Sequence, residues 1–245
     1  MTKPAQPLSV LSAGSMRHAF PAIIAAFAAL NDTPVSLTLG PAGLLRERIE
    51  AGEHFDLFAS ANMAHPRHLA AQGICDHAVC FARNRLCVLA RSDLGLTTAN
   101  FLDIITDPRI KIGTSTPGDD PSGDYAFEVF DLIEAKRPSL GKSLRSRARQ
   151  LVGGRNSPPT PPDKSAGWPI ADGKVDLFLS YYSNARLLKS DPALSVVALP
   201  EELSPVIEYG VTVRKGARAE IGQLRDFLLS SDGQRILEQN GFEPA

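Results

Sequence analysis

The sequence predicts an α/β protein whose sheet is mostly parallel and covered by helices on both faces. Short apolar segments that suit buried strands alternate with amphipathic segments that suit helices, and glycine-containing turns separate them. Alternation of this kind favours parallel strands, because each helix carries the chain back to the same edge of the sheet. The 245 residues, 43% of them hydrophobic, are enough for one large domain or two of ordinary size.

The first strand–turn–helix unit spans residues 8–27. Residues 8–11 suit a buried strand, and Ala13-Gly14 suits a tight turn. Ser15 then stands where a helix N-cap is expected, before apolar residues at helical spacing: Phe20, Ile23, Ile24 and Phe27. A turn of this kind presents a hydroxyl and free N–H groups at the positive end of a helix, which suits an anion. The alternative is an ordinary turn with a capping serine.

The next two units repeat this arrangement. A strand at 35–39 runs through Gly40-Pro41-Ala42-Gly43 into a helix that ends near Gly52. A strand at 55–60 is followed by a helix at 66–72. Ligands in open α/β sheets bind beyond the carboxyl ends of the strands. Three turns fall at such ends, those at Ser15, Ala42-Gly43 and Ser60–Asn62.

The second half continues the alternation. A single apolar strand is predicted at 81–90. A strand at 110–112 leads through a polar turn into a helix that runs towards Pro138, with Ser122 as its candidate N-cap. The remaining expected elements are a helix at 101–105, strands at 175–181, 196–199 and 209–213, and helices at 219–229 and 234–239. Residues 155–162, RNSPPTPP, favour extended polyproline geometry, either as a surface loop or as a rigid wall of a binding site.

Composition and motifs exclude several classes of function. The net charge of −1 gives no strong field for nucleic acid or a membrane surface, and no apolar run is long enough to span a bilayer. No phosphate-binding loop, dinucleotide fingerprint, nucleophile elbow or catalytic triad spacing is present, so we expect neither an enzyme nor a cofactor. His65 and His68 lack the partners of a metal site. Cys75 and Cys80 could pair in an oxidising compartment, although nothing requires it.

The order of the motifs resembles the solute-binding proteins of molybdate and tungstate ABC transporters, within the type II periplasmic binding proteins. The matching segments cover nearly the whole chain: Ala13–Met16, Gly40–Gly52, Asp56–Asn62, Asp120–Ala126, Gly173–Asp176, Tyr181 with Ser183-Asn184-Ala185, and Gly233–Phe242. The resemblance implies a two-lobed fold with a hinge, each lobe a mostly parallel sheet flanked by helices. Residues 1–83 and 208–245 would form one lobe, and residues 84–207 the other.

The resemblance also implies a ligand and a site. A tetrahedral dianion, molybdate or tungstate, would lie in the cleft and be delivered to a transporter permease by a monomeric periplasmic protein. Ser15 would donate its hydroxyl and N–H, Ser122 an N–H and Tyr181 its hydroxyl, with the Ala42, Gly43 and Gly123 backbone alongside. The N-terminus lacks a secretory apolar region, so either a leader has been removed or the chain is cytoplasmic.

Two departures from the family pattern bear on the ligand. The family usually has a serine where this chain has Ala42, and an Asn-Val-Arg helix start where this chain has Pro161-Pro162-Asp163-Lys164. Asp163 would repel a dianion unless it turned away, and Ser157, Thr160 or a backbone N–H could compensate. Two other functions are weighed against transport: a cytosolic ligand-sensing module that binds another small anion or metabolite, and an enzyme on the same scaffold.

Overall fold

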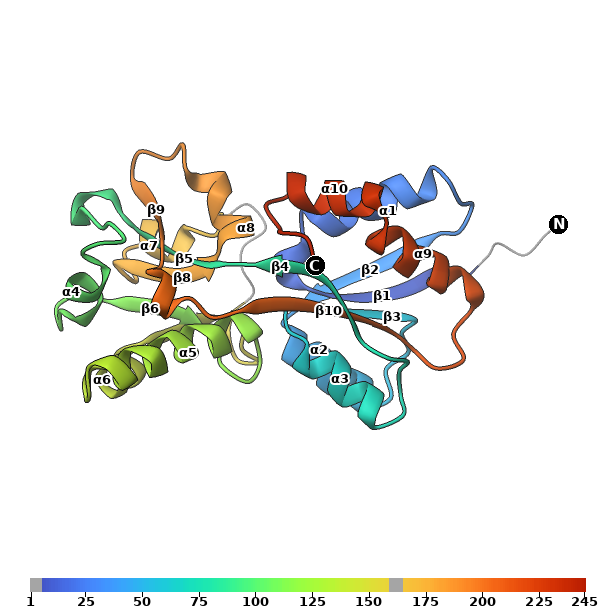
Figure 1. The fold of residues 1–245 in the computed structure, drawn as a ribbon, viewed down its shortest axis with the longest axis horizontal. Helices are drawn as coiled ribbons and strands as arrows, with labels where there is room; N and C mark the ends of the chain where they lie inside the picture. Colours follow the sequence, from blue (N-terminus) through green and yellow to red (C-terminus); the bar gives the residue numbers. More distant parts are fainter. Residues whose placement is uncertain (1–5, 159–164) are drawn as a thin grey trace. The chain divides into compact units, whose positions relative to one another are not determined.

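The computed structural model describes residues 6–158 and 165–245. Two compact units divide the chain: residues 1–84 together with 207–245, and residues 85–206. The chain therefore leaves the first unit once and returns to it once (Figure 1). Within the described residues, no helix has both the length and the apolar character needed to cross a membrane.

The first unit is a five-stranded sheet with helices on both faces. Its elements are β1 (Leu8–Ala13), the 3-10 turn η1 (Gly14–Met16), α1 (Ala19–Ala28), β2 (Val35–Gly40), α2 (Ala42–Glu50), β3 (Leu57–Ser60), α3 (Ala64–Ala71), β4 (Val79–Asn84), β10 (Ile207–Val213), α9 (Ala219–Leu229) and α10 (Ser231–Gln239). The strand order is β2-β1-β3-β10-β4. Figure 1 shows α1, α9 and α10 over one face of this sheet and α2 and α3 over the other.

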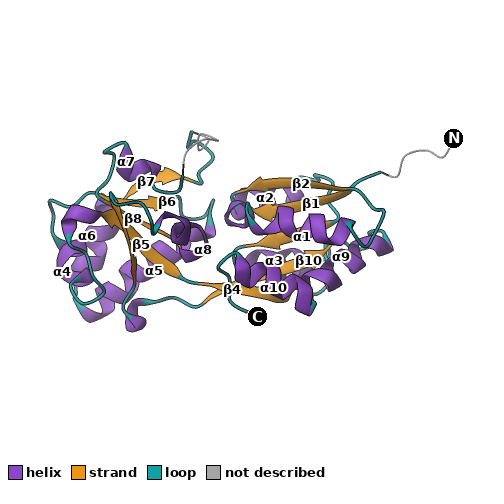
Figure 2. Ribbon diagram, turned by 90° about the horizontal axis from the view of Figure 1, so that it is seen from above, coloured by secondary structure: helices purple, strands orange, loops and turns teal. Residues whose placement is uncertain are grey.

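The second unit repeats this plan. Its elements are β5 (Leu86–Arg91), η2 (Ser92–Leu94), α4 (Phe101–Thr106), β6 (Ile112–Ser115), α5 (Pro121–Lys136), α6 (Leu140–Arg147), β7 (Arg149–Val152), α7 (Trp168–Ala171), β8 (Leu177–Tyr181), α8 (Tyr182–Ala185), η3 (Arg186–Leu188), β9 (Leu194–Ala198) and η4 (Glu201–Leu203). The strand order is β7-β6-β8-β5-β9, and Figure 2 labels β7, β6, β8 and β5.

Each sheet is mixed, with one reversed strand. β1 pairs in parallel with β2 and β3, whereas β10 runs antiparallel to β3 and β4. β6 pairs in parallel with β7 and β8, whereas β5 runs antiparallel to β8 and β9. The reversed strands β5 and β10 are the first strands that the chain forms after passing from one unit to the other. The α/β class with mostly parallel strands is confirmed.

The prediction of one strand over residues 81–90 is wrong. β4 ends at Asn84 in the first sheet and β5 begins at Leu86 in the second. Both segments are apolar because each is buried in its own unit, so apolar character alone does not show the break. Residues 140–152 also form α6 and β7, elements that the sequence reading did not assign.

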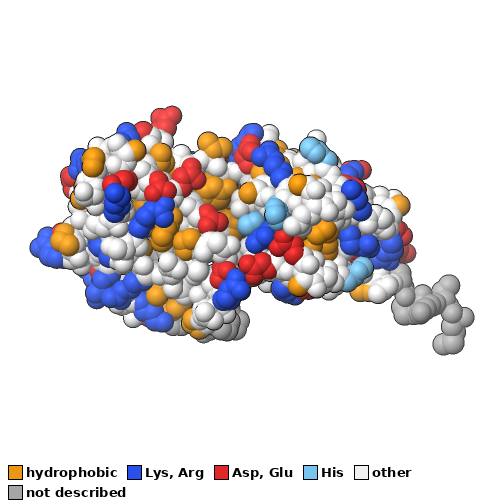
Figure 3. All heavy atoms as spheres, turned by 90° about the horizontal axis from the view of Figure 1, so that it is seen from below, with side chains coloured by type: hydrophobic (Ala, Val, Ile, Leu, Met, Phe, Trp, Pro, Cys, Tyr) orange, Lys and Arg blue, Asp and Glu red, His pale blue; other side chains and the backbone are white. Residues whose placement is uncertain are grey.

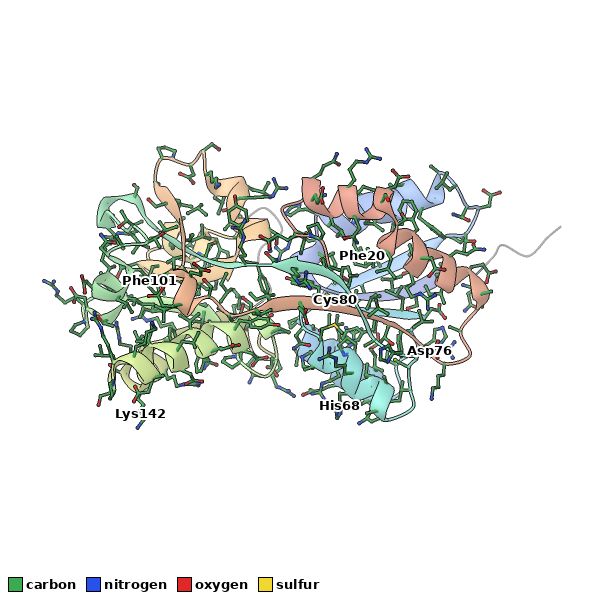
Figure 4. The ribbon with its side chains drawn as sticks, viewed as in Figure 1. Phe20, His68, Asp76, Cys80, Phe101 and Lys142 are labelled. Carbon is green, nitrogen blue, oxygen red and sulfur yellow. The ribbon has the colours of Figure 1, made fainter. Side chains whose placement is uncertain are left out.

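Aromatic side chains fill the core of the first unit beneath the turn at Ser15. Phe81 makes edge-to-face contacts with Phe20 and Tyr209, and Tyr209 makes another with Phe242. All but Phe242 are at most 1% exposed, and Figure 4 labels Phe20 within this core. Edge-to-face pairs of this kind add to the burial energy and fix ring orientation. The phenol ring of Tyr209 is therefore held rigidly.

Candidate functional site

Ser15 lies in the 3-10 turn that follows β1. This turn is closed by the Arg17 N–H, which donates to the Gly14 carbonyl at 3.3 Å. The prediction that Ser15 caps the following helix is wrong, because α1 begins only at Ala19 and His18 holds the N-cap position. Ser15 is half-buried, and the Arg17 guanidinium also donates to the Gly14 carbonyl, at 2.9 Å. The turn thus carries a positive charge as well as a hydroxyl.

The Ser15 hydroxyl has a partner in the core of the same unit. Its Oγ lies 2.9 Å from the Tyr209 hydroxyl oxygen, which accepts a hydrogen bond from Asn84 Nδ2 at 3.2 Å. Tyr209 is fully buried, and Asn84 is 4% exposed. The sequence reading missed both residues. Each of the two is a polar side chain in an otherwise apolar strand, close to a point where the chain passes from one unit to the other. This pattern could have identified them as candidate site residues.

The turn after β2 lies beside the Ser15 turn. In the parallel pairing of β1 with β2, Ala13 is opposite Gly40, so both turns leave the same sheet edge. A Cβ placed on Gly14 would lie 3.7 Å from the Gly40 carbonyl oxygen. α2 begins at Ala42, and its N-cap residue, Pro41, provides no side-chain hydrogen bond. The N–H groups of Ala42 and Gly43 are among those that a helix cannot satisfy internally, so they are available to a ligand.

The polar side chains of the third turn at this edge, residues 60–62, make their hydrogen bonds within the chain. Ser60 Oγ donates to Asn62 Oδ1 at 3.1 Å, and the same oxygen accepts from the His65 N–H at 3.0 Å. The prediction that this turn falls at the end of β3 is correct, since β3 ends at Ser60. Its side chains, however, mainly stabilise the start of α3.

Ser122 and Gly123 lie in the first turn of α5, but Ser122 is not the N-cap. Asp120 holds that position: its Oδ1 accepts from the Ser122 N–H at 3.0 Å, and its carbonyl accepts from the Gly123 N–H at 2.8 Å. Asp is a preferred N-cap and Pro121 suits the first helical position, so the signal was present in Asp120-Pro121. The two N–H groups expected to bind an anion thus have partners within the chain.

Tyr181 ends β8 and lies near the first turn of α5. Its ring makes an edge-to-face contact with Tyr125 of α5, with centroids 6.5 Å apart, and Tyr181 is 4% exposed. β8 and β6 are parallel, so Tyr181 and the turn after β6 lie at the same sheet edge. The second unit therefore places Ser122, Gly123 and Tyr181 at one edge, as the first unit does Ser15, Ala42 and Gly43.

A pocket of about 360 Å³ lies in the second unit; its lining includes Ser157, which was weighed as a compensating donor, but none of Ser122, Gly123 and Tyr181. Its lining is Thr116, Asp119, Gln150, Leu151, Gly154, Arg155, Asn156, Ser157, Pro158 and Lys174. Asp119 pairs with Arg155 at 2.9 Å. Burial opposes ionisation of Asp119, but hydrogen bonds from the Arg155 backbone and side chain lower its pKa overall. Thr160 and the Pro161–Lys164 segment lie outside the described residues.

Reactive or metal-binding groups do not gather in the described part of the chain. Within residues 6–158 and 165–245, no cluster of three or more His, Cys, Asp or Glu side chains could hold a metal ion. The three cysteines are free thiols (Cys80 is labelled in Figure 4). Burial raises the pKa of Cys75 to about 11 and that of Cys87 to about 12, which makes both thiols poor nucleophiles at neutral pH. Basic and acidic side chains are interspersed on the face shown in Figure 3.

Two mixed sheets flanked by helices, each sheet with one reversed strand, are the architecture of type II periplasmic solute-binding proteins. The sequence model of the bacterial extracellular solute-binding protein family matches residues 8–243. The chain belongs to this family. It is also 36% identical to an uncharacterized protein of Pasteurella multocida over 241 residues, which cover 97% of this chain and 99% of that protein.

Solved structures share the fold at low sequence identity. The periplasmic molybdate-binding protein of Azotobacter vinelandii is 19% identical, with a TM-score of 0.77 and coverage of 97% of this chain and 99% of that one. The sulfate-binding protein SubI of Mycobacterium tuberculosis is 16% identical, with a TM-score of 0.79 and coverage of 98% and 88%. At these identities the likeness defines the fold and leaves the ligand to be argued from the site.

Proposed function

We propose that this protein binds a small tetrahedral oxyanion, molybdate or tungstate, and delivers it to the permease of an ABC transporter. One observation carries the proposal: in the first unit the Ser15 turn lies beside the turn that leads into α2, and the N-cap residue of α2 provides no side-chain hydrogen bond. Helix N-termini bind anions through these N–H groups and the helix dipole. Ser122 Oγ and the Tyr181 hydroxyl would complete the donor set from the second unit.

The family and fold support this proposal. Two proteins with the same fold are named for molybdate and sulfate, both tetrahedral oxyanions. As a monomeric periplasmic protein, the chain would bind the anion through neutral hydrogen-bond donors and deliver it to the permease. No step of this cycle needs catalysis or a cofactor.

Asp120 favours a second candidate, an anion that also carries hydrogen-bond donors. Its carboxylate caps α5 and places negative charge at the helix end that would otherwise attract the oxyanion. A dianion without protons gains nothing from this group, whereas the hydroxyl of a phosphorylated polyol or hydroxy acid could donate to it. In this arrangement the phosphate would bind at the first unit and the hydroxyls at Asp120.

A thermal-shift panel tests both candidates. The ligands are molybdate, tungstate, sulfate, inorganic phosphate, acetate and glycerol 3-phosphate, each at several concentrations. A ligand present at 100 times its dissociation constant stabilises the folded state by about 2.7 kcal/mol. Stabilisation by molybdate or tungstate alone supports the first candidate, and a larger shift with glycerol 3-phosphate than with inorganic phosphate supports the second. A protein that none of these anions stabilises would contradict both.

A further inference from the structure

The Ser15 hydroxyl can donate to an anion only when its proton is not already used within the protein. Its Oγ lies 2.9 Å from the Tyr209 hydroxyl oxygen, and this bond can run in either direction. If Ser15 donates to Tyr209, its proton is lost to the ligand. If Tyr209 donates to Ser15, the Ser15 proton is left for an anion at the edge of the sheet. Whether the Ser15 hydroxyl can donate to a bound anion therefore depends on the direction of its hydrogen bond with Tyr209.

Asn84 favours the second direction. Its Nδ2 is a donor without acceptor capacity, and it donates to the Tyr209 oxygen at 3.2 Å. The phenol oxygen then serves as an acceptor for Asn84, which favours donation of its proton to the neighbouring Ser15 Oγ. Each bond in such a chain polarises the next, which makes the last hydroxyl a better donor.

The surrounding structure holds this chain of groups in place. Asn84 ends β4 and Tyr209 lies in β10, and the two strands pair with Ile207 opposite Asn84 and Tyr209 opposite Ala82. The Tyr209 ring is fully buried between Phe81 and Phe242, which meet it edge to face. Neither residue was expected at the site from the sequence, and neither lies in the turns expected to contact the ligand.

We propose that Asn84 and Tyr209 are positioning residues that direct the Ser15 proton towards the bound oxyanion. The proposal rests on the proposed function, because it concerns how Ser15 recognises that anion. The oxyanion would then be recognised through a series of uncharged hydrogen-bond donors, Asn84, Tyr209 and Ser15, that is held in the core of the first unit. A protonated ligand oxygen would be recognised less well, since it would need an acceptor where Ser15 offers a donor.

A double-mutant cycle tests the proposal with molybdate as the probe, measured by calorimetry. The variants are Ser15→Ala, Tyr209→Phe and the double variant, and Tyr182→Phe is the control because it removes a tyrosine hydroxyl that accepts from Lys189 in the second unit. We expect Ser15→Ala and Tyr209→Phe each to weaken binding about tenfold, a loss of about 1.4 kcal/mol. The double variant should bind as Ser15→Ala does, since Tyr209 acts only through Ser15.

Additive losses in the double variant would overturn the proposal, as would unchanged binding in either single variant. Asn84→Asp provides a second test, also useful if Tyr209→Phe folds poorly. The ionised carboxylate introduced by this substitution accepts a hydrogen bond from Tyr209, so Ser15 has to donate to Tyr209. Molybdate affinity should therefore fall when Asn84→Asp is made in the wild-type protein. It should change much less when Asn84→Asp is made in the Ser15→Ala variant. A wild-type protein that binds no oxyanion would refute the proposed function and this proposal together, whereas binding with additive losses refutes this proposal alone.

Discussion

His65 should make the folded state lose stability in mild acid. It lies in α3, half-buried, with a fully buried Nε2 atom that has no hydrogen-bond partner among residues 6–158 and 165–245. Burial, followed by the charges of Arg46 and His68, lowers the pKa of His65 from 6.5 to about 4, and Glu50 opposes this only in part. The fold therefore requires the neutral imidazole, whereas the unfolded chain binds a proton at the ordinary value.

The sign and size of the effect follow from this difference. Above pH 6.5 His65 is neutral in both states and contributes no pH dependence. Between pH 6.5 and about 4 only the unfolded state binds the proton, so stability falls as the pH falls. Between pH 7 and pH 5 the loss is about 2 kcal/mol, as one pKa unit corresponds to about 1.4 kcal/mol. Below about pH 4 both states are protonated and the contribution levels off.

Urea unfolding followed by circular dichroism measures this loss at pH 7 and pH 5, at constant ionic strength. His65→Gln should remove about 2 kcal/mol of the decrease, because the amide does not titrate. His77→Gln is the matched control, since His77 is exposed. The reasoning is refuted if His65→Gln loses as much stability between the two pH values as the wild-type protein does.

Three further predictions concern the site and the packing of the second unit. Asp120→Asn keeps a capping oxygen but removes the charge, so calorimetry should show about tenfold tighter molybdate binding, with Asp124→Asn unchanged. Tyr181→Phe should weaken molybdate binding by a similar factor while leaving the melting temperature of the unliganded protein within a few degrees; unchanged affinity would remove Tyr181 from the site. Gly141→Ala should destabilise by several kcal/mol, since the new Cβ would overlap the Phe130 carbonyl oxygen; thermal unfolding should show no comparable loss for Gly222→Ala, where no atom of the described residues lies within 4 Å of the new Cβ.

The elements that the sequence predicted well are those whose apolar pattern is local. The strand at residues 8–11 and the helix at 219–229 follow from alternating or helical spacing of buried side chains, and both are present. The apolar pattern did not show the break at Arg85, because the break depends on which sheet each half joins; only the family resemblance put a lobe boundary near it, between residues 83 and 84. α6 was missed because its residues are mostly polar and only Gly141 and Leu144 are buried.

At the candidate site, the turns were predictable and the hydrogen bonds were not. Glycine, proline and small polar residues identify the turns at Ser15, Ala42 and Ser122 without knowledge of the tertiary structure. The partner of the Ser15 hydroxyl is 194 residues away at Tyr209, a distance over which no local rule operates. The cap of α5 was a local error, because Asp120 competes with Ser122 for the same role and Asp120 directly precedes Pro121.

The N-termini of α2, in the first unit, and α5, in the second unit, differ in charge, and this difference bears on the selectivity of the proposed site. α2 begins without a side-chain cap, so its dipole and N–H groups are available to a ligand anion. α5 begins with the Asp120 carboxylate, which accepts from the Ser122 N–H and places a negative charge against the positive pole of the helix. A bound anion should therefore gain most of its electrostatic stabilisation from the first unit. The second unit would then contribute hydroxyl donors, and through Asp120 it would favour ligands that have a proton to donate.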